Sequence, residues 1–455
     1  MRNQLTESCV AQRGLPTTGD PLRVRGSHIR VMRIIDRLNI GGPAKHVSWL
    51  TAGLNNERFQ SVLITGIVPD GEGDMSYFAD ALGVKPIVIP EMSRELSWRD
   101  ALVVLKLLRQ MWRIRPDIVH THKSKAGATG RLAALLYRWL TPSALWLQPR
   151  PCWVVHTYHG HTFHSYFGPA RQWVFQMIER ALARFCTDRI IVISQQQRRE
   201  ILEQFRIGQP RQFVVIPLGL DLDELLQPPC ATTDRLRQAP DEVLIGIVGR
   251  LCEVKNHALF LDAAARLLAD QSVANNNLRF VLVGDGHLRD RLQAHAQRLG
   301  IAERVMFAGF RRDALRLYAD LDIVALTSLN EGTPLTLIEA MASGCAVAAT
   351  EVGGVIDLMG ARQTEQERFS VWEHGVTARS QDAEGMARAL RFLIEQPAMR
   401  RQMGQRGRAY VMSHLTKERL LSDMQAFYSE LVGLSAEALS QARRAARSTV
   451  GGENV

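Results

Sequence analysis

The sequence predicts an α/β protein of two doubly wound, parallel-sheet domains with a cleft between them. Three observations favour this fold class. The chain has 455 residues, enough for two or more domains with cores of their own. Hydrophobic residues make up 46% and charged residues 22%, an ordinary globular composition. Patterns typical of buried strands alternate with helical patterns, and this alternation runs through the chain twice.

The first series of strands and helices fills the amino-terminal half. Apolar runs suited to buried strands occur at Ile29–Ile35, Ser61–Ile67, Pro86–Ile89, Asp117–His120, Trp153–Thr157, Arg189–Ile193 and Phe213–Ile216. Helical patterns lie between them, at Ala44–Leu54, Trp98–Ile114, Ala126–Trp139, Gln172–Phe185 and Gln195–Phe205. We therefore predict a first domain over residues 28–226, preceded by a disordered extension over residues 1–27.

A second series of strands follows a proline-containing stretch at residues 227–241, which we interpret as a linker. Its strand patterns are Val243–Val248, Arg279–Val283, Val305–Phe307, Ile323–Thr327 and Ala346–Ala349. The second domain is predicted over residues 242–416. A terminal helix over 417–434 is expected to pack back on the first domain, and residues 435–455 are expected to fray.

The distribution of charge indicates which kind of partner the protein binds, and the cysteines indicate in which compartment it works. The net charge is +10, and residues 1–230 carry all of it, with 29 Lys and Arg against 19 Asp and Glu. Such an excess indicates an anionic partner, either nucleic acid or a membrane surface, although a solvated basic surface is an equal alternative. The six cysteines are scattered, which suits a reducing cytoplasm and no structural zinc. No stretch is long and apolar enough to span a bilayer.

Two cations follow the first strand of the second series. The strand Val243–Val248 leads into Gly249 and Arg250, and Lys255 follows just ahead of a helix. Glycine permits a tight turn, and two cations at one strand end can bind a single anion. A weaker Gly-Asp-Gly turn, at Gly284–Gly286, follows the next strand.

A strand, a polar loop and a helix occupy residues 327–344. Glu331 lies in the loop and Glu339 in the helix, eight positions later. Leu335 and Thr336 stand at the start of this helix, where their backbone N–H groups can bind an anion. Carboxylates beside a phosphate-binding helix start suit a ligand that carries both hydroxyl groups and phosphates.

These motifs resemble the signature of family 4 retaining glycosyltransferases of the GT-B fold. The resemblance rests on Gly249–Leu251 with Lys255, on Gly284–Gly286 and on the segment from Glu331 to Glu339, and it covers roughly residues 30–430. It implies two Rossmann-like domains with an interdomain cleft, the first for the acceptor and the second for a nucleotide sugar. The closest members build capsule, O-antigen or exopolysaccharide.

The resemblance implies donor-site roles by position. Arg250 and Lys255 hold the diphosphate and stabilise its charge as it leaves. Glu331 binds hydroxyl groups of the donor sugar, and Glu339 binds those of the ribose. Further donor contacts are implied at Gly41, Gly42, Gly284, Phe310, Gly332, Thr333, Leu335 and Thr336. UDP is the preferred nucleotide and GDP the second.

On the acceptor side, His122 ends a strand and resembles the active-site histidine of the family. It completes the implied catalytic set with Glu331, Arg250 and Lys255. Acceptor contacts are expected from Lys123, Lys125, His159 and His161. A histidine cluster can also bind a metal, but no Cys, Asp or Glu adjoins this one, so no metal or other cofactor is expected. The Asp-x-Asp sequence at Asp221–Asp223 is interpreted as a turn at the domain crossing.

Two stretches rich in basic and aromatic residues suit binding to an anionic membrane surface. Trp98–Arg115 and the segment from Arg138 to Trp153 combine Trp and Leu with Arg and Lys. Each also suits an ordinary domain helix with a solvated face. Because no RNA-binding motif is present, we favour an anionic membrane surface over nucleic acid. The resulting hypothesis is a cytoplasmic enzyme, peripheral at the inner membrane face, with a glycan or polyprenyl-diphosphate-linked acceptor.

Three other functions remain open at this point. A GT-B nucleotide-sugar epimerase would release a free sugar epimer without an acceptor. A noncatalytic nucleotide-binding regulator would bind the nucleotide without turnover. A dehydrogenase is disfavoured because no first strand leads into G-x-G-x-x-G.

Overall fold

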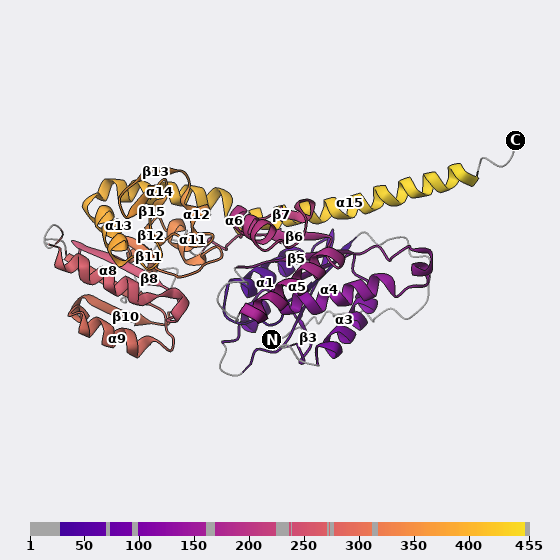
Figure 1. Ribbon diagram of the computed structural model, residues 1–455, viewed down its shortest axis with the longest axis horizontal. Helices are drawn as coiled ribbons and strands as arrows, with labels where there is room; N and C mark the ends of the chain where they lie inside the picture. Colours follow the sequence, from indigo (N-terminus) through magenta and orange to yellow (C-terminus); the bar gives the residue numbers. More distant parts are fainter. Residues whose placement is uncertain are drawn as a thin grey trace, which may run out of the picture.

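The structure, a computed structural model, describes residues 28–69, 73–92, 99–160, 169–223, 236–237, 239–270, 273, 277–311 and 317–450. Two α/β bodies lie side by side along the long axis, and the last helix runs back along the first of them (Figure 1). The predicted extension at residues 1–27 and most of the predicted linker at 227–241 lie outside the described residues.

The first body contains a seven-stranded sheet in the order β3-β2-β1-β4-β5-β6-β7, with every pair parallel. Its strands are β1 (Ile29–Ile34), β2 (Phe59–Thr65), β3 (Ile87–Val88), β4 (Ile118–His122), β5 (Trp153–Thr157), β6 (Arg189–Val192) and β7 (Phe213–Val215). The chain winds outward from β1 to one edge and then returns to build the other half. This is the doubly wound order that the alternation of strands and helices predicts.

Helices cover both faces of this sheet. They are α1 (Gly42–Gly53), α2 (Ser76–Ala81), α3 (Asp100–Ile114), α4 (Ser124–Trp139), α5 (Pro169–Phe185) and α6 (Gln195–Arg199), with short helical turns η1 (Pro142–Trp146), η2 (Glu200–Gln204) and η3 (Pro210–Gln212). Successive residues of β1 point to opposite faces. Met32 packs in one core with α3 and α4, whereas Val31 packs in another with α1 and the terminal helix.

The second body contains an eight-stranded sheet in the order β10-β9-β8-β11-β12-β15-β14-β13. Its strands are β8 (Glu242–Val248), β9 (Asn277–Val283), β10 (Val305–Gly309), β11 (Ile323–Leu326), β12 (Ala346–Thr350), β13 (Arg362–Glu365), β14 (Phe369–Trp372) and β15 (Gly375–Ala378). Strand β14 runs antiparallel to both of its neighbours, and the other pairs are parallel. The sequence predicts the first five strands and misses β13 to β15, of which β13 is polar and exposed throughout.

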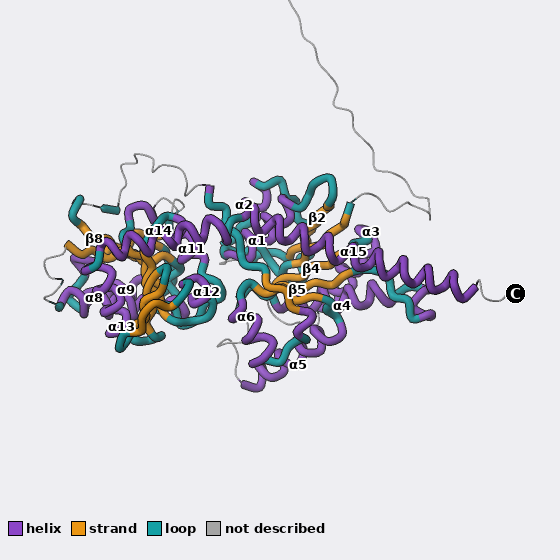
Figure 2. Tube along the Cα trace, turned by 90° about the horizontal axis from the view of Figure 1, so that it is seen from above, coloured by secondary structure: helices purple, strands orange, loops and turns teal. Residues whose placement is uncertain are grey.

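Helices and turns of the second body are η4 (Glu253–Lys255), α8 (His257–Ala269), α9 (Arg289–Arg298), η5 (Ala302–Arg304), η6 (Tyr318–Asp320), α11 (Leu335–Ala342), α12 (Val355–Met359), α13 (Ala383–Glu395) and α14 (Pro397–His414). Helices lie on both sides of the strands (Figure 2), and the side chains form two buried clusters, one on each face of the sheet. One cluster holds α8 and α13, and the other holds α11 against β11 and β12.

The last helix, α15 (Lys417–Val450), connects the two bodies. Leu420, Met424 and Tyr428 bury their side chains in the first body beside Val31. The backbones of Leu220 and Lys417 are hydrogen bonded where the chain crosses between the bodies. The helix extends to Val450, and fraying of residues 435–455 stays a prediction.

None of the helices within the described residues combines the length and the apolar composition that crossing a bilayer requires.

Candidate active site

A cavity of about 2010 Å³ lies between the two bodies, where the carboxyl ends of the parallel strands meet. Residues that follow β1, β4 and β5 line one side, and residues at or just after the ends of β8, β9 and β11 line the other. The sequence-predicted site residues on its wall are Lys123, Lys125, His159, Arg250, Lys255, Gly284, Phe310, Glu331 and Gly332. The remaining predicted residues lie behind this wall or outside the described part of the chain.

An ion pair forms the centre of the second body's wall. The Lys255 ammonium donates to Oε1 of Glu331 at 2.5 Å. The hydroxyl of Ser328 donates to the same oxygen at 2.6 Å. Lys255 reaches this position because β8 turns at Gly249, whose φ of +158° lets the backbone pass closely beside the lysine stem. The two residues that the sequence assigns to the diphosphate and the donor sugar are therefore in contact.

Arg250 stands beside this pair on the same wall and is exposed. Among the residues that the structure describes, it has no ion-pair partner. Phe310 is 63% exposed and presents its ring to the cavity from the end of β10. The backbones at Gly284 and Gly249 lie in close contact, and a Cβ on Gly284 would come within 2.0 Å of the carbonyl oxygen of Gly249. An unpaired cation beside an open aromatic ring suits a phosphate and a planar base.

The start of helix α11 supplies free backbone donors. The helix begins at Leu335, directly after Pro334, and no side chain caps this end. The first N–H groups of a helix have no partner within it, so those of Leu335 and Thr336 can bind an anion. Both residues are absent from the cavity wall, as is Thr333, whose buried hydroxyl has no partner among the described residues.

Glu339 lies one turn into α11 and is partly buried. The hydroxyl of Tyr318 donates to its Oε2 at 3.1 Å. Burial raises the pKa of this carboxyl, while Lys45 and Tyr318 oppose the change. Glu339 is also absent from the cavity wall.

On the first body's side of the cavity, both predicted acceptor lysines form ion pairs with aspartates. The Lys123 ammonium lies 2.9 Å from Oδ1 of Asp36, at the end of β1. It also donates to Oδ1 of Asn39 at 2.9 Å. The Lys125 ammonium lies 3.0 Å from Oδ1 of Asp100. The two lysines therefore line the cavity as halves of ion pairs rather than as isolated cations.

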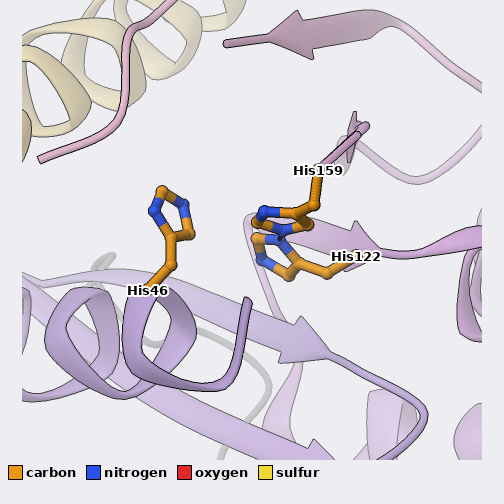
Figure 3. A group of neighbouring side chains, drawn as sticks. All are labelled: His46, His122 and His159. Carbon is orange, nitrogen blue, oxygen red and sulfur yellow. Dashed lines mark hydrogen bonds between the residues drawn. The ribbon is translucent and has the colours of Figure 1, made fainter. Parts of the chain in front are cut away.

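The predicted active-site histidine belongs to a group of three imidazoles, from His46, His122 and His159 (Figure 3). Nδ1 of His122 lies 2.9 Å from Nε2 of His159, and these two rings lie nearly one above the other. His46 faces them from α1, and one nitrogen from each residue lies within 4.8 Å of the others. His161, the fourth predicted acceptor residue, lies outside the described residues.

Electrostatics keep these imidazoles neutral. Burial is the largest cause, and it lowers the pKa of His46 to about 3, with Arg33 and Arg419 adding to the effect. Burial also lowers the pKa values of His122 and His159 well below their usual range. Nε2 of His122 and Nδ1 of His46 are buried without a partner among the described residues. Neutral imidazoles with unshared nitrogens can form hydrogen bonds to a polar ligand.

Glycines let the two bodies touch around the cavity. A Cβ on Gly42 would lie 2.8 Å from Cδ1 of Leu335, so the glycine loop of the first body packs against the start of α11. A Cβ on Gly332 would lie 3.0 Å from Cα of Gly160. Gly42, predicted from the sequence as a donor contact, thus contacts the donor-side helix itself.

Sequence reasoning missed four residues that complete this site. Asp36 binds Lys123, Ser328 binds Glu331, Tyr318 binds Glu339 and His46 faces His122. Only His46 carried a usable signal, because it lies near the start of α1, just after the glycine pair Gly41 and Gly42. The other three became visible through contacts between segments that are far apart in the chain.

Family models match a large part of each body. Residues 41–219 match the model of the glycosyl transferase 4-like domain, and residues 232–410 match that of the glycosyl transferases group 1. The chain is a family 4 glycosyltransferase. The predicted family is therefore confirmed, and the two matched segments correspond to the two sheets.

Named relatives of this glycosyltransferase include two bacterial enzymes. The UDP-Gal:alpha-D-GlcNAc-diphosphoundecaprenol alpha-1,3-galactosyltransferase of Escherichia coli is 29% identical over 308 residues, 66% of this chain and 74% of the relative. The N-acetylgalactosamine-N,N'-diacetylbacillosaminyl-diphospho-undecaprenol 4-alpha-N-acetylgalactosaminyltransferase of Campylobacter jejuni is 30% identical over 214 residues, 47% of this chain and 53% of the relative.

Among solved structures, the glycosyltransferase is similar to Anabaena HepE in complex with UDP. The TM-score is 0.67 at 19% identity, and the match covers 88% of this chain and 100% of HepE. At this identity the likeness concerns the fold. It confirms the predicted GT-B architecture of two Rossmann-like domains.

Proposed function

We propose that this glycosyltransferase moves a hexose or N-acetylhexosamine from a UDP-sugar to a polyprenyl-diphosphate-linked glycan, with retention of anomeric configuration. The observation that carries the proposal is the group of Arg250, Lys255 and Glu331 in the lining of a cavity that His159, one of the three imidazoles, also lines from the first body. The two cations and the carboxylate line the proposed donor side of the cavity, and the proposed acceptor side belongs to the first body. That arrangement suits transfer between two bound ligands.

The donor side supports a nucleoside diphosphate sugar. Arg250 and Lys255 would bind the diphosphate, with the start of α11 behind them. Phe310 would stack on the base, and Glu339 would accept hydrogen bonds from the ribose. UDP is favoured because the relative from Escherichia coli is named for a UDP-sugar donor and HepE was solved with UDP. GDP is the second choice.

In the proposed reaction, the bond between the sugar C1 and the diphosphate oxygen breaks while C1 bonds to an acceptor hydroxyl oxygen. The electron pair of the broken bond stays on the diphosphate, where Arg250 and Lys255 stabilise the new charge. The acceptor hydroxyl approaches from the face that the diphosphate leaves, which gives retention. Its proton passes to the departing phosphate oxygen, and Glu331 orients the donor sugar.

The acceptor side supports a glycan on a lipid diphosphate. Both relatives named above carry diphosphoundecaprenol or diphospho-undecaprenol in their names. His122 and His159 are neutral and can hydrogen bond to acceptor hydroxyl groups, with Lys123 and Lys125 nearby. We propose synthesis of cell-surface polysaccharide such as lipopolysaccharide, with the enzyme attached peripherally to the inner face of the membrane.

The proposal is tested by incubating the purified chain with a panel of UDP- and GDP-sugars and undecaprenyl-diphosphate-linked N-acetylglucosamine. Mass spectrometry should detect one added hexose or N-acetylhexosamine, and NMR should show the same anomeric configuration in donor and product. Activity should persist in excess EDTA, because no metal is expected. A free sugar epimer formed without acceptor would instead identify an epimerase. Nucleotide binding without turnover on any acceptor would identify a regulator.

A further inference from the structure

Exposed apolar side chains gather on one part of the first body. Among the described residues, 21 large hydrophobic side chains are exposed, and 14 of them lie between Leu102 and Phe185. These are Leu102, Leu105, Trp112, Leu132, Trp139, Leu140, Leu145, Trp146, Leu147, Trp173, Val174, Met177, Ile178 and Phe185. They belong to α3, α4, η1, α5 and their adjoining turns, so a contiguous stretch of sequence supplies most of the exposed apolar surface.

The elements that carry them form one layer. Met32 and Val119 point into the core with α3 and α4. Strand register places His156 beside Ile190, on the same face as Val154, and Ile190 packs with α5. Helices α3, α4 and α5 therefore cover the same face of the seven-stranded sheet. We call their outer surface, together with η1, the α3–α5 face.

The same stretch is strongly basic. Residues 100–185, from the start of α3 to the end of α5, contain 12 Lys and Arg but only 3 Asp and Glu. Each of the three acidic groups is already paired: Asp100 with Lys125, Asp117 with Arg30 and Glu179 with Arg131. The exposed charges on α3 include Arg109 and Arg113, which stand one helical turn apart beside Trp112. Cations that alternate with exposed aromatic rings fit the headgroup region of an anionic bilayer.

The turn η1 is the most exposed part of this face. Leu145, Trp146 and Leu147 are 88%, 80% and 81% exposed, three large apolar side chains in succession. In water this arrangement is unfavourable, since nothing described in the structure covers them. A Trp between two Leu side chains, at the end of a basic layer, is suited to enter the outer acyl region.

We propose that the α3–α5 face docks on an anionic lipid bilayer, with η1 inserted and the helices lying along the headgroups. The inference rests on the proposed function, because docking there presents a lipid-linked acceptor to the cavity. Ile178 of α5 belongs to the exposed face and also lines the cavity, beside Phe175. Helix α5 therefore contributes apolar side chains both to the α3–α5 face and to the cavity wall. The second body contributes only Phe310 and Leu329 to the exposed apolar set, and both line the cavity.

Co-sedimentation with vesicles tests this docking. The full chain should bind vesicles of phosphatidylcholine with 30% phosphatidylglycerol at least tenfold more tightly than pure phosphatidylcholine. The triple variant Leu145→Ser, Trp146→Ser, Leu147→Ser and the double variant Arg109→Glu, Arg113→Glu should each lose at least tenfold in affinity. The matched control Tyr77→Ser replaces an aromatic residue that is 66% exposed on α2, which covers the opposite face, and should bind like wild type.

Two further measurements separate docking from catalysis and from self-association. The triple and the double variant should each retain the thermal stabilisation by UDP and the activity on a short-chain, water-soluble acceptor, while their activity on vesicle-embedded acceptor falls. Equal vesicle binding by wild type and the triple variant would overturn the docking proposal even if transfer is intact. Concentration-dependent dimerisation that the triple variant abolishes would also overturn it, because a second copy would then cover the face.

Discussion

The ammonium of Lys255 and the carboxylate of Glu331 lie 2.5 Å apart on the cavity wall. Their side chains are 23% and 12% exposed, so the pair is shielded without being sealed. A bound diphosphate would compete with Glu331 for Lys255, and a donor sugar would compete with Lys255 for Glu331. The pair thus neutralises two groups that the donor would need, and it keeps each of them in place.

Lys255→Ala is expected to abolish the thermal stabilisation by UDP and to lower kcat/KM by about 100- to 1000-fold, because it removes a cation from the leaving group's position. The fold should persist, since the lysine side chain is partly exposed. Thermal shift with and without UDP, followed by transfer assays, measures both effects. Arg266→Ala, an exposed cation of the same domain, serves as the control. Undiminished stabilisation by UDP in Lys255→Ala would contradict the assignment.

Gly332→Ala is expected to lower transfer at least tenfold while leaving the unfolding temperature nearly unchanged. Its new Cβ would lie 3.0 Å from Cα of Gly160 and 3.2 Å from the carbonyl oxygen of His159, so the two bodies would have to separate slightly. Gly160→Ala is the matched variant, because its Cβ would lie 3.9 Å from Cα of Gly332, an ordinary contact. Steady-state kinetics on both variants should distinguish them. Equal activities would show that this contact does not limit transfer.

Arg131→Ala is expected to destabilise the first body by about 3–5 kcal/mol, because it leaves a buried carboxylate unpaired. Nη2 of Arg131 donates to both oxygens of Glu179, at 2.9 and 2.8 Å, and both side chains are fully buried. The double variant Arg131→Met, Glu179→Leu should recover much of the loss. Urea unfolding gives the free energies of all three proteins. A loss below about 1 kcal/mol in Arg131→Ala would mean that water or another cation replaces the arginine.

Stability should fall as the pH drops below about 6.5, the usual pKa of histidine. Burial lowers the folded-state pKa of His46 to about 3 and those of His120 and His156 well below the usual range. Between the folded and unfolded pKa values the unfolded chain binds more protons, so each imidazole costs about 1.4 kcal/mol of stability per pH unit. The contribution is fully present above pH 6.5.

Urea unfolding at pH 7.5, 6.5 and 5.5 measures this dependence. The unfolding free energy should change little between the first two values and fall steeply at the third. His46→Gln should reduce the slope, because it removes one of the buried imidazoles. A flat profile down to pH 5.5 would contradict the neutral state of the buried imidazoles.

The fold was predictable from local patterns where strands are long and apolar. Trp153–Thr157 forms β5 with the predicted bounds, and β8 differs from its prediction by one residue. The strand β13 was not predictable in this way, because Arg362–Glu365 is polar and exposed throughout. Its pairing with β14 fixes it as a strand, and that pairing depends on residues outside the segment.

By itself, the sequence determined the reaction family and the donor-site motifs, because glycines, cations and carboxylates at strand ends keep a fixed spacing along the chain. Only the tertiary structure decided which charged side chains form ion pairs and which side chains share a surface. It pairs Lys123 with Asp36, places His46 opposite His122, and gathers the exposed Trp residues of three helices on one face. Burial, pairing and shared surfaces arise from segments far apart in sequence, and their packing sets which charges are neutralised and which remain available.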